Sequence, residues 1–301
     1  MNPTRPTKLS EFIGQEKVKK TVDILTKSAS IRDEPLPHLL MSGPAGTGKT
    51  TLSHILASEI HGNFKVTNGA SIKSDRDVAK YVASLKRKDV LFIDEVHRMN
   101  IRAFEWLYTI MEDFSFGLHG NKIKIPKFTL IGATTLISKL PRPFRERFKF
   151  IVEFEDYALT DLSKIVERIA LNYNLRITKD ICQQIARTCR GNPRKVVTRT
   201  EWIRDYLIAG KKKRMNSSEL KEAFKLCGVD AHGLELIDHK YLQTLYNNGT
   251  CSLRKIASIL NMEPENIVEN IEPYLLQMDL IEIDRAGRRI NDFMYDQIKE
   301  K

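Results

Sequence analysis

The chain has 301 residues, of which 42% are hydrophobic and 29% are charged. This length is enough for two or three domains with cores of their own, and the composition is ordinary for a globular protein. No apolar run approaches the roughly 18 residues of a membrane span, and the N-terminus lacks the apolar segment of a secretory signal. The four cysteines show no CxxC spacing. We therefore expect no membrane association, a cytoplasmic location, and cysteines that serve as small core residues.

The net charge of +11 favours a polyanionic partner, but the charge is unevenly distributed. Lys and Arg outnumber Asp and Glu by 25 to 18 in residues 1–157 and by 16 to 8 in residues 158–230, whereas residues 231–301 carry 8 against 12. The basic peak at residues 211–214 is either a phosphate contact or, as we favour, a solvated loop before a helix that Asn216 caps.

Residues 43–50 read GPAGTGKT and fit the phosphate-loop pattern at every position. The apolar run 38–41 before them predicts a buried strand, and the spacing of apolar residues after them predicts a helix. Glycines, here Gly43, Gly46 and Gly48, let backbone N–H groups curl around a phosphate at a helix N-terminus. Lys49 is expected to reach the outer phosphates of ATP, and Thr50 to bind Mg²⁺. The alternative is a glycine-rich turn that binds nothing.

Residues 89–95 read DVLFIDE, which predicts a buried parallel strand that ends in two carboxylates. Adjacent carboxylates at a strand end are costly unless a metal ion or water occupies them. We expect Asp94 to hold Mg²⁺ and Glu95 to polarise the water that attacks the γ-phosphate. The alternative, an acidic strand end in solvent, fits less well beside a complete phosphate loop.

The rest of the first domain is predicted to contain helices at 15–30 and 77–85 and strands at 64–67, 128–135 and 150–154. The strand at 128–135 ends in hydroxyls, so Thr134 either senses a γ-phosphate through water or caps the strand. Residues 141–148 form an arginine cluster between apolar anchors, PRPFRERF. In a single subunit these arginines would be solvated, whereas in a ring one of them would reach the neighbouring nucleotide.

This succession of phosphate loop, Asp-Glu strand, Thr-ended strand and arginine cluster resembles the AAA+ ATPases. Within them it resembles the RuvB family most, in residues 5–6, 12–15, 91–98, 111–113, 131–135 and 144–148. The resemblance implies an α/β large domain with a mainly parallel sheet at 1–157, a small all-α lid at 158–230 and a winged-helix domain at 231–301.

The resemblance also implies roles for single residues. Arg147 becomes an arginine finger that acts on the adjacent subunit, which makes hydrolysis depend on ring assembly. Gly46, Lys49, Thr50 and Thr51 hold the phosphates and Mg²⁺, and Thr4, Arg5 and Tyr157 flank the adenine and ribose. Further cofactor contacts are implied for Glu112, Asp113 and Phe114.

The second domain is predicted to contain helices at 159–172 and 178–189, capped by Thr160 and Thr178. The turn at 191–194 reads GNPR and starts a further helix. The helix dipole disfavours a cation at a helix start, so Arg194 indicates a nearby anion. By the resemblance Arg194 is a second sensor of the nucleotide; the alternative is a surface arginine.

The third domain shows helical spacing at 239–246, 252–260 and 265–278, followed by a hairpin around 285–288, which is a winged-helix pattern. The helix at 265–278 contains acidic residues and no Lys or Arg, so it is unsuited to reading bases in the major groove. We expect the wing arginines Arg285, Arg288 and Arg289 to contact the DNA backbone. By the resemblance to the family, a second DNA-contacting arginine is replaced here by Ile283. The alternative to a DNA-binding wing is a solvated hairpin turn.

The function implied by the resemblance is an ATP-dependent DNA helicase or translocase that drives branch migration of Holliday junctions in recombination and in the repair of DNA damage, including the SOS response. Its implied partners are duplex DNA at four-way junctions, a homohexameric ring, RuvA and the RuvC resolvase, in a bacterial cytoplasm. Residues 115–127 are shorter than the hairpin with which the family docks onto RuvA. The alternatives are a clamp-loader-like AAA+ switch and a protein remodeller; the arginine-bearing wing favours DNA over polypeptide.

Overall fold

The computed structural model of the protein describes residues 5–118 and 121–291. The chain forms two compact units, which are described separately below. Unit 1 consists of Met1–Asn174 and Gly191–Thr200, and unit 2 of Leu175–Arg190 and Glu201–Lys301.

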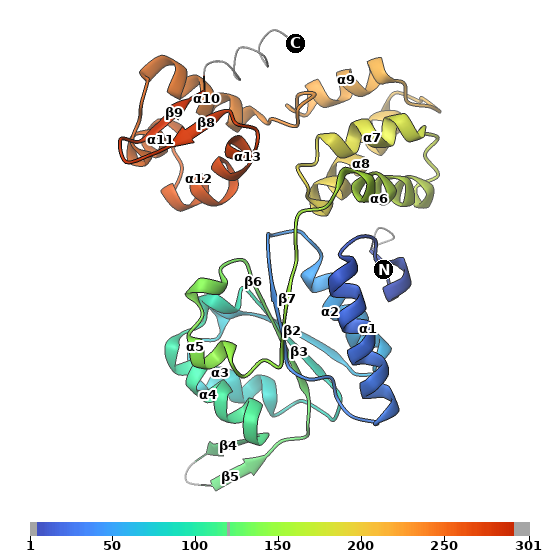
Figure 1. Ribbon diagram of the computed structural model, residues 1–301. Coiled ribbons are helices and arrows are strands. Elements are labelled where there is room, and N and C mark those ends of the chain that lie inside the picture. The colour runs from blue at the N-terminus through green and yellow to red at the C-terminus, as the bar shows by residue number, and fades with distance from the viewer. Residues whose placement is uncertain (1–4, 119–120, 292–301) are drawn as a thin grey trace. The chain divides into compact units, whose positions relative to one another are not determined.

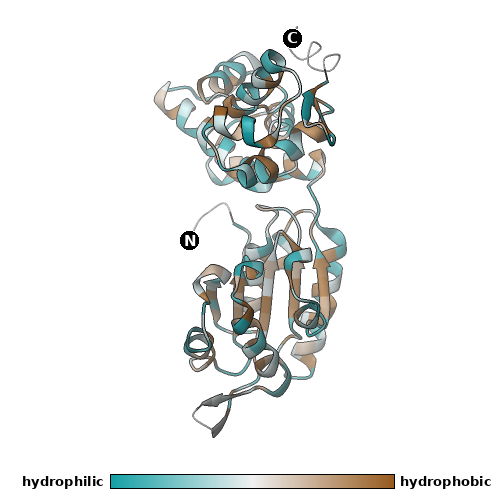
Figure 2. Cartoon of the chain, turned by 90° about the vertical axis from the view of Figure 1, so that its left-hand side faces the viewer, coloured by the Kyte–Doolittle hydropathy of each residue, from teal (hydrophilic) through white to brown (hydrophobic). Residues whose placement is uncertain are grey.

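Unit 1 is built on a parallel sheet with the strand order β2-β3-β6-β1-β7. The strands are β1 (Leu39–Ser42), β2 (Phe64–Asn68), β3 (Val90–Asp94), β6 (Thr129–Thr134) and β7 (Phe150–Glu153). Every residue of β1 and β6 is buried, as expected of parallel strands covered on both faces. The hydrophobic strands stand out in Figure 2. The five strands predicted from the sequence are confirmed, as is the α/β fold.

Helices cover both faces of this sheet (Figure 1). On one face lie α1 (Glu16–Ile31) and α2 (Lys49–Glu59), and on the other α3 (Asp75–Val82), α4 (Ile101–Asp113) and α5 (Arg142–Arg145). Each face has its own hydrophobic core. In α1 the buried residues Val18, Val22, Thr26 and Ala29 recur at helical spacing. They therefore lie on one face of the helix, and α1 packs through that face.

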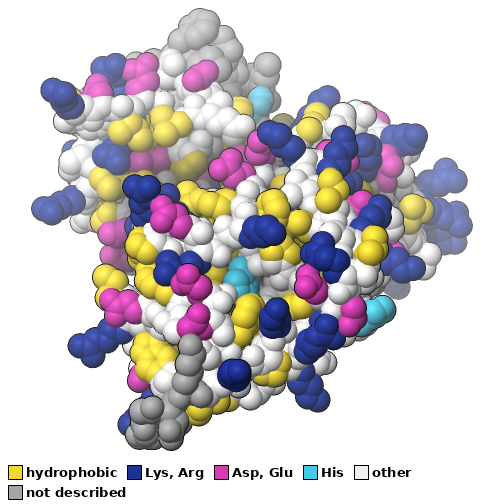
Figure 3. Space-filling model, turned by 60° about the horizontal axis from the view of Figure 1, so that its bottom comes forward, with side chains coloured by type: hydrophobic (Ala, Val, Ile, Leu, Met, Phe, Trp, Pro, Cys, Tyr) yellow, Lys and Arg dark blue, Asp and Glu magenta, His cyan; other side chains and the backbone are white. Residues whose placement is uncertain are grey.

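The remaining elements of unit 1 are short, apart from two long helices. They are η1 (Leu9–Glu11), η2 (Gly69–Ser71), η3 (Val96–Arg98), η4 (Ile137–Lys139), the strands β4 (Ser115–Leu118) and β5 (Asn121–Lys124), α6 (Leu159–Asn172), and the start of α8 (Pro193–Ala209). β4 and β5 pair antiparallel, so the shortened segment between Asp113 and Phe128 still forms a hairpin. Figure 3 looks onto the end of unit 1 that carries this hairpin.

Unit 2 contains α7 (Lys179–Arg187), the end of α8, α9 (Ser217–Leu226) and a winged-helix domain. The predicted cap at Thr178 is confirmed, because its side chain accepts a hydrogen bond from the Ile181 N–H. Asn216 caps α9 in a reciprocal box with Glu219, also as predicted. In unit 1 the predicted cap at Thr160 is wrong, because Ala158 is the N-cap of α6.

The winged-helix domain contains α10 (Leu236–Asn248), α11 (Leu253–Leu260), α12 (Pro264–Asn270), α13 (Glu272–Gln277), β8 (Ile281–Ile283) and β9 (Arg288–Ile290). The single helix predicted at 265–278 is wrong: the structure divides it into α12, which ends at Asn270, and α13, which begins at Glu272, with Ile271 between them. Pro273 explains the break, because a proline has no N–H to donate to the preceding turn. The wing hairpin is confirmed.

The cysteines follow the prediction at three of four positions. Cys182, Cys189 and Cys251 are buried, whereas Cys227 is exposed, which corrects the expectation for that residue. In the described part of the chain, no helix combines the length and the apolar character needed to cross a bilayer.

Candidate functional site

The carboxyl edge of the sheet brings the predicted nucleotide residues together. The phosphate loop leaves β1 and enters α2, Asp94 ends β3, and Thr134 ends the neighbouring strand β6. In open α/β sheets this edge is where ligands bind.

Two glycines of the phosphate loop have no room for a side chain. Gly43 has φ +137°, and a Cβ there would collide with the backbone carbonyl of Phe154. Gly46 has φ +81°, and a Cβ there would collide with the side chain of Asn192. The loop is therefore held to a path that only glycine allows, as a cradle of backbone N–H groups around a phosphate requires.

Lys49 is buried at the base of this loop, with 7% of its surface exposed. Its ammonium donates to the carbonyls of Gly43 at 2.7 Å and Pro44 at 2.8 Å. Burial lowers the pKa of Lys49 to about 8, although the carboxylates of Asp94 and Glu95 act in the opposite direction. An anionic ligand bound beside a lysine in this position would stabilise the charged form of the lysine.

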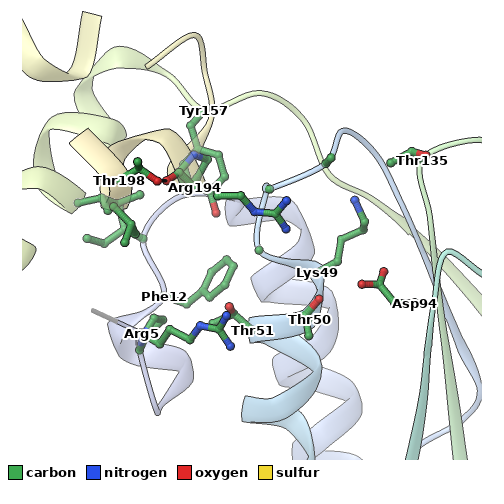
Figure 4. Close-up of a pocket in the computed structure, with 18 of the residues that line it drawn as sticks. Arg5, Phe12, Lys49, Thr50, Thr51, Asp94, Thr135, Tyr157, Arg194 and Thr198 are labelled. Carbon is green, nitrogen blue, oxygen red and sulfur yellow. Dashed lines mark hydrogen bonds between the residues drawn. The ribbon is translucent and has the colours of Figure 1, made fainter. Parts of the chain in front are cut away.

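A cavity of about 540 Å³ opens beside the loop, within the range of small-molecule sites. Eleven of the predicted site residues line it: Arg5, Gly46, Gly48, Lys49, Thr50, Thr51, Asp94, Glu95, Thr134, Tyr157 and Arg194. Figure 4 shows Lys49, Thr50 and Asp94 around one end of the cavity, and Phe12 and Tyr157 toward the other. This separates a charged end, suited to phosphates, from an end with aromatic rings, suited to a base.

Tyr157 and the turn before α8 are tied to the phosphate loop. The Tyr157 hydroxyl donates to the Thr47 carbonyl at 3.1 Å, and burial raises the pKa of this phenol. Asn192 donates its amide to the Ala45 carbonyl at 3.0 Å. Two residues later Arg194 points into the cavity (Figure 4), close enough to lower the pKa of Lys49.

The residues at the charged end suit a magnesium ion bound together with a nucleotide. The Thr50 hydroxyl and the Asp94 carboxylate both face the cavity and are oxygen donors of the kind Mg²⁺ prefers. Among the described residues no group of three or more His, Cys, Asp or Glu gathers as a metal site. A magnesium ion here would therefore complete its shell with phosphate oxygens and water, as is usual for this ion.

Glu95 follows β3 in left-handed backbone geometry, with φ +50°. Its Oε2 lies 3.6 Å from Nε2 of His97 and 4.0 Å from the Arg98 guanidinium. Thr134 is buried at the end of β6, and its hydroxyl lies 2.9 Å from Nδ1 of the same histidine. Glu95 and Thr134 thus both line the cavity, and the imidazole of His97 lies between their side chains.

Arg147 does not line the cavity of its own chain. Its guanidinium donates to the Pro143 carbonyl at 2.9 Å, lies 3.3 Å from a carboxylate oxygen of Glu112, and stacks over the Tyr108 ring at 4.7 Å. Asp113 is the last residue of α4, and the Phe114 ring packs against His38 and Phe128. Glu112, Asp113 and Phe114 do not line this cavity. Thr4 lies outside the described residues.

Comparison with known protein families shows the family to which the chain belongs. Residues 4–154 match the model of the Holliday junction DNA helicase RuvB P-loop domain, residues 157–230 that of the RuvB AAA lid domain, and residues 231–299 that of the RuvB C-terminal winged helix domain. The chain belongs to the RuvB family.

Individual relatives agree with this assignment. The RuvB subunit of the Holliday junction branch migration complex from Thermotoga petrophila is 38% identical, over 98% of this chain and 92% of the relative. The Rickettsia africae RuvB is 36% identical, over 99% and 90%. The solved Thermotoga maritima RuvB Holliday junction branch migration motor superposes with a TM-score of 0.89 at 38% identity, covering 99% of both chains. The three-domain RuvB architecture of P-loop AAA+ domain, lid and winged helix is thus established.

The three wing arginines of this RuvB-family chain differ in their partners and in their exposure. Arg288 donates to Glu272 at 2.9 Å, and Glu272, 2% exposed, also accepts from the Tyr241 hydroxyl at 3.0 Å. This hydrogen bond raises the pKa of Arg288. Arg289 pairs with Glu282 and is half-exposed. Arg285, at the tip, is exposed and forms no ion pair with any residue the structure describes.

Several cavity residues were missed by sequence reasoning. Arg168 on α6 and Thr198 on α8 line the cavity from helices whose sequence carries no local sign of a ligand. Phe12 was recognised only as part of a family motif. Asn192 does not line the cavity, and an Asn before a Pro at a helix start favours a side-chain hydrogen bond to nearby backbone, here from the Arg194 N–H at 2.9 Å. Its second bond, to the Ala45 carbonyl of the phosphate loop, joins segments that are distant in sequence and was not predicted.

Proposed function

We propose that this chain is the ATP-hydrolysing motor that drives branch migration of Holliday junctions during recombination and DNA repair. The observation that carries the proposal is the cavity that joins the phosphate loop, the Asp94–Glu95 strand end, Thr134 and Arg194 in a RuvB-family chain. Its three domains would run over 1–157, 158–230 and 231–301. Its relatives carry the name of a branch migration complex subunit.

In the proposed hydrolysis, Lys49 and the loop N–H groups hold the β- and γ-phosphates, with Thr51 beside them. Thr50 and Asp94 would hold Mg²⁺, which neutralises charge on the phosphates when bound. Glu95 orients the attacking water and withdraws its proton, and Thr134 and Arg194 detect the γ-phosphate. Arg5 and Tyr157 flank the adenine and ribose, with Thr4 proposed beside them.

The position of Arg147 supports an active site that is shared between subunits. Its guanidinium is held on the α4–α5 side by Glu112 and Tyr108, away from the cavity of its own chain. We place it, with Glu112, Asp113 and Phe114, next to the nucleotide of an adjacent subunit in a homohexameric ring. Such trans-acting arginines accelerate phosphoryl transfer by about 10³–10⁵-fold.

The assembly we propose contains junction DNA, RuvA and RuvC in a bacterial cytoplasm, with a role in the SOS response. The β4–β5 hairpin would dock RuvA. The wing would contact the DNA backbone chiefly through Arg285, with Arg289 in support, because Arg288 is occupied by the buried Glu272. Backbone contacts suit a motor that has to pass any sequence.

The direct test is ATP hydrolysis by the full chain with and without a synthetic four-way junction. We expect magnesium-dependent turnover that the junction stimulates and that Glu95→Gln abolishes while nucleotide binding persists. Turnover that continues unchanged in Glu95→Gln would contradict the assignment of the catalytic carboxylate.

A further inference from the structure

His97 occupies a position that no role assigned above explains. It lies in η3, directly after the Asp94–Glu95 strand end, and its side chain is 7% exposed. One ring nitrogen, Nδ1, lies 2.9 Å from the Thr134 hydroxyl oxygen. The other, Nε2, lies 3.6 Å from Oε2 of Glu95. The two faces of one buried imidazole therefore meet the γ-phosphate sensor and the water-activating carboxylate.

The hydrogen bonds around Thr134 favour one arrangement of protons. The Thr134 oxygen accepts the Leu136 N–H at 3.0 Å, and its own hydrogen is available to donate to Nδ1 of His97. The neutral imidazole then carries its hydrogen on Nε2, directed at Glu95. In the opposite tautomer the Nε2 lone pair would face a carboxylate, which is repulsive. The Thr134 hydroxyl then donates to His97, and the Nε2–H of His97 faces Glu95 at 3.6 Å, just beyond the distance of a direct hydrogen bond.

The Glu95 carboxylate needs neighbouring side chains to hold it in position. Left-handed backbone geometry is unfavourable for a glutamate and persists only where the surroundings impose it. About a third of the side chain is exposed. The Arg98 guanidinium, 4.0 Å away and itself 60% exposed, is a weak support because solvent screens it. The buried imidazole of His97 is the better-fixed neighbour.

We propose that His97 is a positioning residue for ATP hydrolysis, which links Thr134 to Glu95 and holds the Glu95 carboxylate toward the attacking water. This rests on the proposed function of the site. A shift of Thr134 on contact with the γ-phosphate would reach Glu95 through the imidazole ring, so that the carboxylate is aligned only when ATP is in place.

Two substitutions separate positioning from packing. His97→Phe keeps the ring volume and removes both contacts, and we expect kcat for ATP to fall about 10- to 100-fold. KM and the affinity for a fluorescent ATP analogue should stay within about threefold. His97→Gln places an amide donor near the position of Nε2 and should recover part of the lost kcat. His54→Phe, the same change on an exposed histidine of α2 outside the cavity, is the matched control and should match the wild type.

A second readout does not depend on the folding of His97→Phe. In ¹⁵N spectra of the full-length protein at a pH where the ring is neutral, the His97 nitrogens, assigned by their loss in His97→Gln, should report hydrogen on Nε2. Thr134→Val should weaken that preference. If His97→Phe is unstable, judged from its melting temperature, these spectra decide the question.

Failure of this inference is distinguishable from failure of the proposed function. Inactive Glu95→Gln together with a folded His97→Phe of unchanged kcat, or a neutral ring with hydrogen on Nδ1, would overturn the role of His97 and leave the function standing. Unchanged turnover in Glu95→Gln would instead contradict the proposed function itself.

Discussion

Lys49 is the residue whose ionisation most directly reports nucleotide binding. Burial lowers its pKa to about 8, and a triphosphate placed beside it would favour the charged form and raise that pKa again. Between about pH 8 and pH 9, where ATP is already fully ionised, binding should take up a fraction of a proton. Isothermal titration calorimetry in two buffers of different ionisation enthalpy measures this uptake. Proton release, or no exchange at pH 8.5, would contradict the placement of Lys49.

Arg288 and Arg285 should separate stability from DNA binding. Arg288→Met leaves the buried carboxylate of Glu272 without its guanidinium, so we expect the unfolding free energy of the winged-helix domain to fall by about 3 kcal/mol. Arg285→Met at the exposed tip should change it by less than about 0.5 kcal/mol while weakening junction binding. Thermal unfolding and DNA titration of both variants test this. A stable Arg288→Met that loses DNA affinity would reverse the assignment.

At the scale of single residues, the sequence predicts site residues that are close together in the chain better than site residues that come from distant elements. The phosphate loop, Asp94 and Glu95 are legible because the chemistry needs fixed spacings along the chain. Arg168 lines the cavity, and Asn192 bonds to the phosphate loop, from elements remote in sequence. The direction of Arg288 depends on Glu272, a buried partner whose burial no local pattern reveals.

Among the elements, buried parallel strands were the easiest to predict, because a run of apolar residues bounded by polar ends permits little else. The boundary of α6 was correct but its cap was not, since Ala158 and not Thr160 stands before the first turn. The break between α12 and α13 was overlooked because helical spacing continues across Ile271, although Pro273 signalled it.

The β4–β5 hairpin is the element on which the proposed docking of RuvA depends. Ile123 on β5 is 39% exposed, so its side chain is accessible to a partner at the end of unit 1 that carries the hairpin. Ile123→Asp should weaken RuvA binding by about tenfold or more, without changing ATP turnover of the isolated protein. The control is Ile24→Asp on α1, a residue that is 66% exposed. Equal RuvA affinities for the two variants, measured by calorimetry, would show that docking does not use the hairpin.

For the whole molecule, the decisive question is whether one active site needs two subunits. Arg147→Ala should keep ATP binding and lose about 10³-fold or more in turnover. Mixed with Glu95→Gln subunits, which are inactive but retain the arginine, it should regain activity, because an Arg147→Ala site can then receive the neighbour's guanidinium. Turnover in the mixture no greater than the sum of the two variants would mean that each chain completes its own site.

The central claim, an ATP-driven motor on four-way junctions, is tested most directly by following a labelled junction as it is converted into two duplexes. We expect conversion that requires ATP and active protein and that is absent with Glu95→Gln; adding RuvA should increase it if the hairpin docks. Junction-stimulated ATP hydrolysis with no duplex product, with or without RuvA, would contradict a branch-migration motor and favour a clamp-loader-like switch.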